Sequence, residues 1–200
     1  MSFATAVFPD RYRCAGMALL PHTLGHALLL QRLGNPFAGR PQADAVSPRL
    51  GDVAQALLVC SRPHAEALRM IDTWRERVWL AVASWRVTRA GLARTGDELV
   101  AYLQAAWPTI NWWQPAEGRS RRSGADLLHV LIDRQIRAGL TLQEALGVHL
   151  PVACWAAAIE AERNGAISIR GELDEEISRA YDRMKAAGRL PEPGTVIRRN

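Results

Sequence analysis

Residues 20–37 have the sequence LPHTLGHALLLQRLGNPF, and this stretch marks most clearly where an element begins and ends. Pro21 and Thr23 precede a run of leucines at helical spacing, and Gly34-Asn35-Pro36 follows it. The pattern predicts a short helix over about residues 23–33, with one polar face and one leucine-rich face. Because a leucine-rich face needs a partner surface, we expect this helix to pack inside a larger helical assembly.

The longest predicted helix covers about residues 63–88, a length of roughly 40 Å. Its apolar residues recur every three or four positions, at Leu68, Ile71, Trp74, Val78, Val82 and Trp85. We expect this stripe to face the core and the helix to lie at the centre of the fold. Trp79 lies off the stripe, and we expect it to face either a second helix or a partner protein.

Further apolar periods predict the remaining helices, at about residues 50–60, 95–107, 123–139, 141–146, 151–165 and 172–187. Thr95 with Glu98, and Thr141 with Glu144, have the spacing of capping boxes at helix starts. The expected fold class is all-α, an irregular bundle of six to seven helices around the long central one. We assign residues 1–188 to one helical domain and 189–200 to a disordered basic tail.

Composition favours a globular protein. Hydrophobic residues make up 48% of the chain, and no apolar run approaches the roughly 18–20 residues that span a bilayer. We therefore expect no membrane partner. The cysteines, Cys14, Cys60 and Cys154, are scattered, which predicts buried thiols in a reducing compartment. The net charge is +5 and nearly all of the positive charge is arginine, a bias that GC-rich codon usage also produces.

Chemistry-bearing motifs are weak in this chain. His22 and His26 are four residues apart, but no carboxylate stands between them as in a zinc-protease helix. Glu160 and Glu162 are two apart and point to different faces of one helix. We expect no metal, no cofactor and no catalytic residues.

The segment at residues 108–122 combines aromatic and basic side chains, and it is predicted to be a long loop. Three interpretations stay open. The tryptophans can anchor the loop to the core, the segment can bind a partner protein, or stacking and phosphate contacts can bind single-stranded nucleic acid. We consider nucleic acid the least favoured of the three. The candidate partner-binding residues are Trp79, Trp112, Trp113, Arg119, Arg121 and Arg122.

Three blocks resemble a family of phage tail assembly chaperones from tailed phages and prophages. The first is 20–37, with its Leu-Gly-His, leucine run and Gly-Asn-Pro-Phe ending. The second is 51–61, GDVAQALLVCS, a hydrophobic helix ending in Cys-Ser. The third is 142–165, where Leu150-Pro151, Trp155 and a Glu-Arg-Asn-Gly ending match the family.

The resemblance implies a non-enzymatic helical protein made in the cytoplasm of the bacterial host. It implies a role in tail morphogenesis, with the tape measure protein and the tail tube protein as partners. Two other functions remain alternatives: a nucleic-acid-binding regulator that uses the loop at residues 108–122, and a minor structural tail or connector protein.

Overall fold

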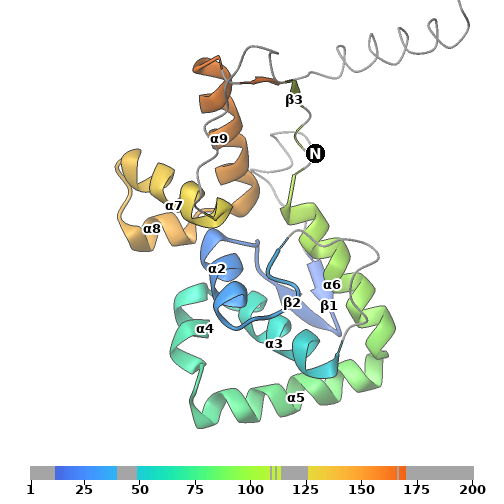
Figure 1. Cartoon of the computed structure of the whole chain (residues 1–200). Helices are drawn as coiled ribbons and strands as arrows, with labels where there is room; N and C mark the ends of the chain where they lie inside the picture. The colour runs from blue at the N-terminus through green and yellow to red at the C-terminus, as the bar shows by residue number, and fades with distance from the viewer. Residues whose placement is uncertain are drawn as a thin grey trace, which may run out of the picture.

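The computed structural model describes residues 12–39, 49–108, 110, 112–113, 126–165 and 167–169. The predicted all-α class is confirmed, because these residues form eight helices and only two short two-stranded ribbons (Figure 1). The helices are α2 (Leu24–Arg32), α3 (Leu50–Cys60), α4 (His64–Met70), α5 (Trp74–Ala90), α6 (Leu92–Ala106), α7 (Leu127–Arg137), α8 (Leu142–Gly147) and α9 (Leu150–Arg163). The strands are β1 (Tyr12–Cys14), β2 (Met17–Leu19), β3 (Trp112–Trp113) and β4 (Ser168–Ile169).

The prediction of one continuous helix at residues 63–88 is wrong, because the chain breaks after Met70 and forms two helices. The described residues therefore contain eight helices, where six to seven were predicted. Ile71 adopts an extended conformation, and Asp72 has a φ of 63°, outside the helical region. The backbone N–H of Asp72 donates to the Glu76 carboxylate at 2.7 Å, which satisfies one donor at the start of α5. The break lets α4 and α5 turn different faces toward the core.

The central helix is α3 and not the predicted 63–88 helix. Seven of its residues are buried, including Val53, Leu57 and Cys60. A helix that is apolar on all sides is stable only when other elements surround it. Helices α2, α4, α5 and α6 all pack against α3, and α5 lies along one outer edge of the molecule (Figure 1).

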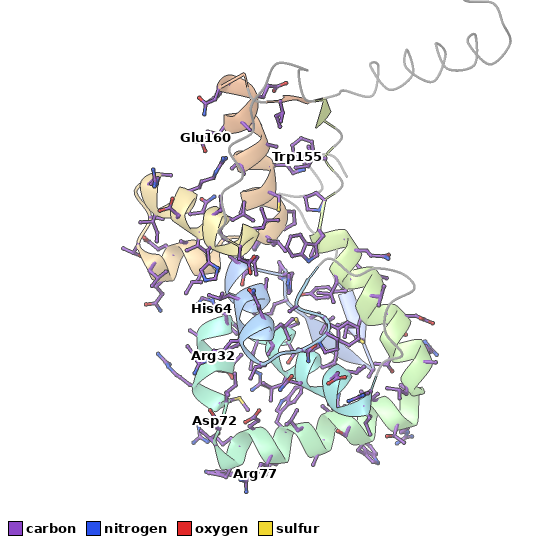
Figure 2. The ribbon with its side chains drawn as sticks, viewed as in Figure 1. Arg32, His64, Asp72, Arg77, Trp155 and Glu160 are labelled. Carbon is purple, nitrogen blue, oxygen red and sulfur yellow. The ribbon has the colours of Figure 1, made fainter. Side chains whose placement is uncertain are left out.

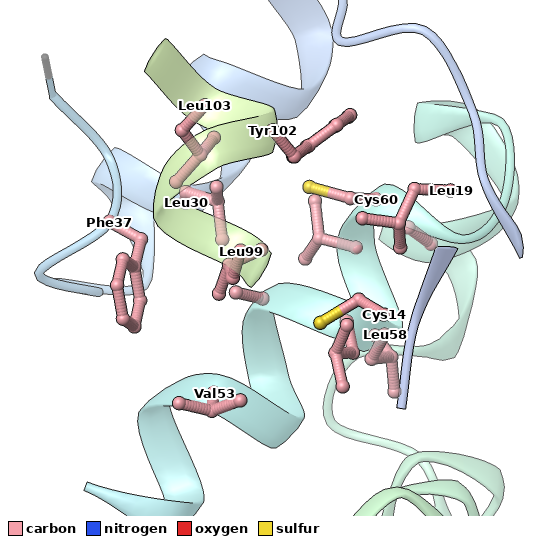
Figure 3. Packing of buried hydrophobic residues seen from close by; sticks show 14 of the residues in the cluster. Cys14, Leu19, Leu30, Phe37, Val53, Leu58, Cys60, Leu99, Tyr102 and Leu103 are labelled. Atoms are coloured by element: carbon pink, nitrogen blue, oxygen red, sulfur yellow. The ribbon is translucent and has the colours of Figure 1, made fainter. Parts of the chain in front are cut away.

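The α2 helix lies between two hydrophobic cores. Leu29 and Leu30 join the larger core, which α3, α6 and the β1–β2 ribbon complete (Figure 3). Leu24 and Ala27 belong to a second core built from α7, α8 and α9. The predicted burial of the leucine face is therefore confirmed. We expected α2 to pack on the 63–88 helix, and it does contact α4 from that stretch, together with α3, α7 and α8. The longer part, α5, packs on α3 instead.

Backbone hydrogen bonds join α2 to the start of α9. The N–H of Leu24 donates to the carbonyl of Val148 at 3.0 Å, and the N–H of Leu150 donates to the carbonyl of His22 at 2.9 Å. These bonds connect segments more than 120 residues apart in the chain. They fix the second core against the first at the N-terminus of α2.

The capping boxes had different outcomes. Thr141 and Glu144 cap α8 reciprocally, as predicted. Thr95 does not cap a helix: α6 begins earlier, at Leu92, and the Thr95 hydroxyl donates to the carbonyl of Gly91 at 2.8 Å inside the helix. Gly91 has a φ of 93°, which a glycine adopts without steric cost, so the chain turns there and α6 starts at once.

Part of the sequence-based assignment falls outside the described residues. The helix expected at 172–187, the domain boundary at 188 and the tail at 189–200 belong to this part. Near the end of the described chain, Ser168–Ile169 form β4 and pair antiparallel with Trp112–Trp113.

Candidate partner-binding surface

The outward face of α5 carries the main exposed apolar surface of the described chain. Trp74 is 70% exposed, Val78 55%, Val82 47% and Trp85 59%. The opposite face holds Ala83 and Val87, which are fully buried, together with the partly buried Trp79 and Leu80. We call Trp74, Val78, Val82 and Trp85 the α5 stripe.

The α5 stripe was predicted to be core, and that prediction was wrong. Two apolar faces compete for burial in this helix. Ala83 and Val87 are small, so the backbone of α5 approaches α3 closely on their side. The bulky indoles of Trp74 and Trp85 are left on the side away from α3.

Trp79 was predicted to face a second helix or a partner. It packs against the larger core, and the guanidinium of Arg62 lies over its ring at 4.8 Å from the ring centroid. This position is that of a cation–π contact at the edge of a core. Trp79 therefore supports the fold, and its partly buried ring is less exposed than those of Trp74 and Trp85.

The other predicted partner-binding residues lie away from α5. The backbone of Trp112 and Trp113 forms β3, which pairs with β4 beside α9, at the opposite end of the molecule from α5 (Figure 1). Arg119, Arg121 and Arg122 fall outside the described residues. The structure thus does not bring Trp79 together with the tryptophans of the 108–122 segment.

Arginines flank the α5 stripe on both sides. The exposed arginines of this helix are Arg75, Arg77, Arg86 and Arg89, and Arg77 lies at the outer edge of the molecule (Figure 2). Arg75 lies over the Trp74 ring at 5.8 Å, and Arg89 over the Trp85 ring at 5.6 Å. Among the ion pairs of the described residues, none includes an arginine of α5.

A shallow hollow of 390 Å³ lies at the C-terminal end of the α5 stripe. Trp85, Arg86 and Arg89 line it from α5, and Ala15, at the turn of the β1–β2 ribbon, lines it from the other side. The hollow is open to solvent and has an aromatic wall and two guanidinium groups. Such a lining suits an acidic side chain or a C-terminal carboxylate.

A second group of polar residues is buried at the N-terminus of α2. The hydroxyl of Tyr102 donates to the carbonyl of Leu20 at 2.8 Å and lies 3.3 Å from Nδ1 of His22. Nε2 of His26 lies 2.9 Å from the carbonyl of Arg62, and its Nδ1 accepts from the N–H of Thr23. Nε2 of His22 has no hydrogen-bond partner among the described residues. These contacts fix α2 between the two cores.

Burial sets the protonation of this polar group. Desolvation, followed by the proximity of His26, lowers the pKa of His22 to about 3. Desolvation also lowers the pKa of His26 to about 4. It raises the pKa of the Cys60 thiol to about 12, and this opposes the thiolate that a nucleophile needs. In the described part of the chain, no cluster of His, Cys, Asp and Glu has the geometry to hold a metal ion.

None of the described helices combines the length and the apolar character needed to cross a membrane. In comparisons with known proteins, no family model, curated protein or solved structure matches this chain.

The sequence carried one signal that separates the α5 stripe from a core stripe. Arginines border it on both sides, at Arg75 and Arg77 near its start and at Arg86 and Arg89 near its end. A core-facing stripe of a surface helix normally has its charged residues on the opposite face. The face opposite the α5 stripe carries Ala83 and Val87 instead.

Proposed function

We propose that the protein is a non-enzymatic helical chaperone that binds a client protein through the outward face of α5. One observation carries the proposal: the side chains of the α5 stripe are exposed together along one helix face. Apolar side chains grouped on a surface mark interaction sites, and Trp and Arg are the residues that most often dominate interface energies. Trp74 and Trp85 are the expected anchors.

The resemblance to phage tail assembly chaperones supports a role in tail morphogenesis. Its three blocks lie together in the fold, since they form α2, the central α3, and α8 with α9. The proposed clients are the tape measure protein and the tail tube protein, bound in the cytoplasm of the bacterial host. The scaffold carries the resemblance, and α5 carries the proposed client contact.

The α5 surface favours a protein client over nucleic acid. Its centre is apolar, with Trp74, Val78, Val82 and Trp85 adjacent to one another, and its arginines are placed at the margins. Nucleic-acid surfaces instead place cations along the path of the phosphates. Two alternatives remain: a nucleic-acid-binding regulator that uses residues 108–122, and a minor structural tail or connector protein. The experiment must distinguish both from a chaperone.

The test is a pull-down with the immobilised protein and the tail proteins encoded beside its gene. We expect the tape measure or tail tube protein to be retained, and Trp74→Ala with Trp85→Ala to abolish retention. The matched control is Leu127→Ala with Leu142→Ala, because these leucines are also exposed but lie on α7 and α8. Retention should weaken only modestly as salt rises.

Three results would overturn the proposal: no tail protein retained, equal loss in the control variant, or DNA captured with a steep salt dependence. The last result would favour the regulator. A fourth result would also overturn it: retention that neither pair of substitutions reduces would favour the structural tail protein.

A further inference from the structure

We infer that the client segment bound by α5 is an acidic amphipathic helix that docks lengthwise on the α5 stripe, with carboxylates on both of its flanks. The inference rests on the proposed function and specifies the chemistry of its client. It is argued from charge complementarity between the exposed arginines of α5 and an acidic client.

The outward face of α5 has the spacing of a helix-pairing seam. Trp74, Val78, Ala81 and Trp85 follow one another at steps of four, three and four residues, and all of them are exposed. This is the alternation of the a and d positions in a heptad. A second helix can therefore pack its own apolar seam along α5 over most of its 17 residues.

The charged residues beside this seam are all basic, and the uncharged Val82 and Ser84 take the two remaining flanking positions. In the same heptad register, Arg75 and Arg89 take e positions and Arg77 takes a g position. Side chains at e and g set partner choice through charge pairs across the seam. The carboxylate of α5, Glu76, is turned away from this face and accepts from the N–H of Asp72. A partner helix would meet arginines on both sides of the seam and no acid from α5.

The hollow at the end of the seam extends the basic character. Arg86 and Arg89 line it together with Trp85. A carboxylate placed there would lie between two guanidinium groups against an aromatic wall, a setting in which charge-assisted hydrogen bonds are strong. The acidic residues of the client are thus expected to continue past the end of α5.

The same charges disfavour a second copy of this chain. Two copies that pair α5 with α5 antiparallel about a two-fold axis would place e positions opposite e positions. Arg75 of one copy would approach Arg89 of the other, and like charges across a seam destabilise it. An anionic membrane would also satisfy arginines and tryptophans, so the experiment includes it as an arm.

The experiment measures binding of labelled helical peptides to the full chain by fluorescence anisotropy. One peptide has leucines at a and d with glutamates at e and g; its partner peptide has lysines at e and g. We expect the wild-type protein to bind the acidic peptide roughly tenfold or more tightly than the basic one. Arg77→Glu with Arg89→Glu should invert that preference.

The matched control is Arg32→Glu with Arg163→Glu, which changes the net charge equally at exposed arginines of α2 and α9. It should keep the wild-type preference, and circular dichroism should show all variants folded. Binding to vesicles of phosphatidylcholine with phosphatidylserine tests for an anionic membrane as the occupant. Light scattering of the protein alone tests for a second copy of the chain.

Equal binding of both peptides, or preference for the basic one by the wild type, would overturn the inference. So would vesicle binding without peptide binding, or a dimer that Trp74→Ala with Trp85→Ala dissolves. Tail proteins retained by the α5 stripe without any acidic preference would remove the inference and leave the proposed function. A preference for the acidic peptide that the substitutions invert, with no tail protein retained, would support the acidic docking surface and remove the proposed role in tail assembly.

Discussion

The guanidinium of Arg62 lies over the indole ring of Trp79, 4.8 Å from its centroid, on the core side of α5. This contact lies on the buried face of α5, which also holds Ala83 and Val87. Because Trp79 points inward, Trp74 and Trp85 point outward, five and six residues away along the same helix. The three tryptophans of α5 thus mark its buried face and its exposed face.

Trp79→Ala should lower the free energy of unfolding by roughly 2–3 kcal/mol, less than a fully buried tryptophan would cost, since its ring is only partly buried. Trp74→Ala should change it by no more than about 0.5 kcal/mol, because the Trp74 side chain is mostly exposed. Urea unfolding of both variants measures the difference. Equal costs would mean that the two faces of α5 are wrongly assigned.

Leu24→Ala and Leu30→Ala should each cost on the order of 2–5 kcal/mol, because both side chains are fully buried on α2. The two leucines serve different cores. If α2 joins these cores into one cooperative unit, either substitution shifts a single unfolding transition seen alike by near- and far-ultraviolet circular dichroism. Two separated transitions would show that the cores unfold independently.

Stability should decrease as the pH falls below 6.5. Burial lowers the pKa of His22 from 6.5 to about 3 and that of His26 to about 4, so the folded protein keeps both rings neutral. The unfolded chain takes up these protons below pH 6.5, so the contribution is complete above pH 6.5 and is lost as the pH falls toward the folded values. The free energy of unfolding should therefore change by roughly 1.4 kcal/mol per pH unit for each histidine.

Urea unfolding between pH 7.5 and 5 measures that slope. His22→Gln should reduce the slope by roughly 1.4 kcal/mol per pH unit, which is the contribution of one proton. His129→Gln is the control, because His129 is exposed on α7, and it should leave the slope unchanged. A slope that His22→Gln does not alter would mean that another group carries the pH dependence.

Arg121→Ala with Arg122→Ala should leave client binding nearly unchanged, since these residues belong to the 108–122 segment and not to α5. Quantitative pull-down with the tail client measures this. Loss of client in this variant, with the α5 stripe intact, would move the client contact from α5 to the 108–122 segment.

Sequence alone located those elements that local chemistry defines. The start of α2 was predictable because Thr23 caps it, and the start of α8 because Thr141 and Glu144 cap each other. These signals act within one turn of chain. The hydrophobic period also identified α3 with its bounds.

Tertiary packing decided what the sequence left open. Residues 63–88 have an unbroken helical period, but an extended Ile71 and the φ of Asp72 interrupt it. Beyond the break, α5 has two apolar faces, and only the close approach of Ala83 and Val87 to α3 determines which one is buried. The hydrophobic period of a sequence shows which residues share a helix face, but it does not show whether that face points to the core or to solvent.

Hydroxyl-radical footprinting of the protein with and without its tail client measures whether the client covers the α5 stripe. The free protein should show strong oxidation of Trp74 and Trp85 and weak oxidation of Trp79, in line with their exposure. In the complex, we expect Trp74 and Trp85 to become protected while Trp79 stays unchanged. Unaltered oxidation of Trp74 and Trp85 in a saturated complex would contradict the account, because the client would then bind elsewhere.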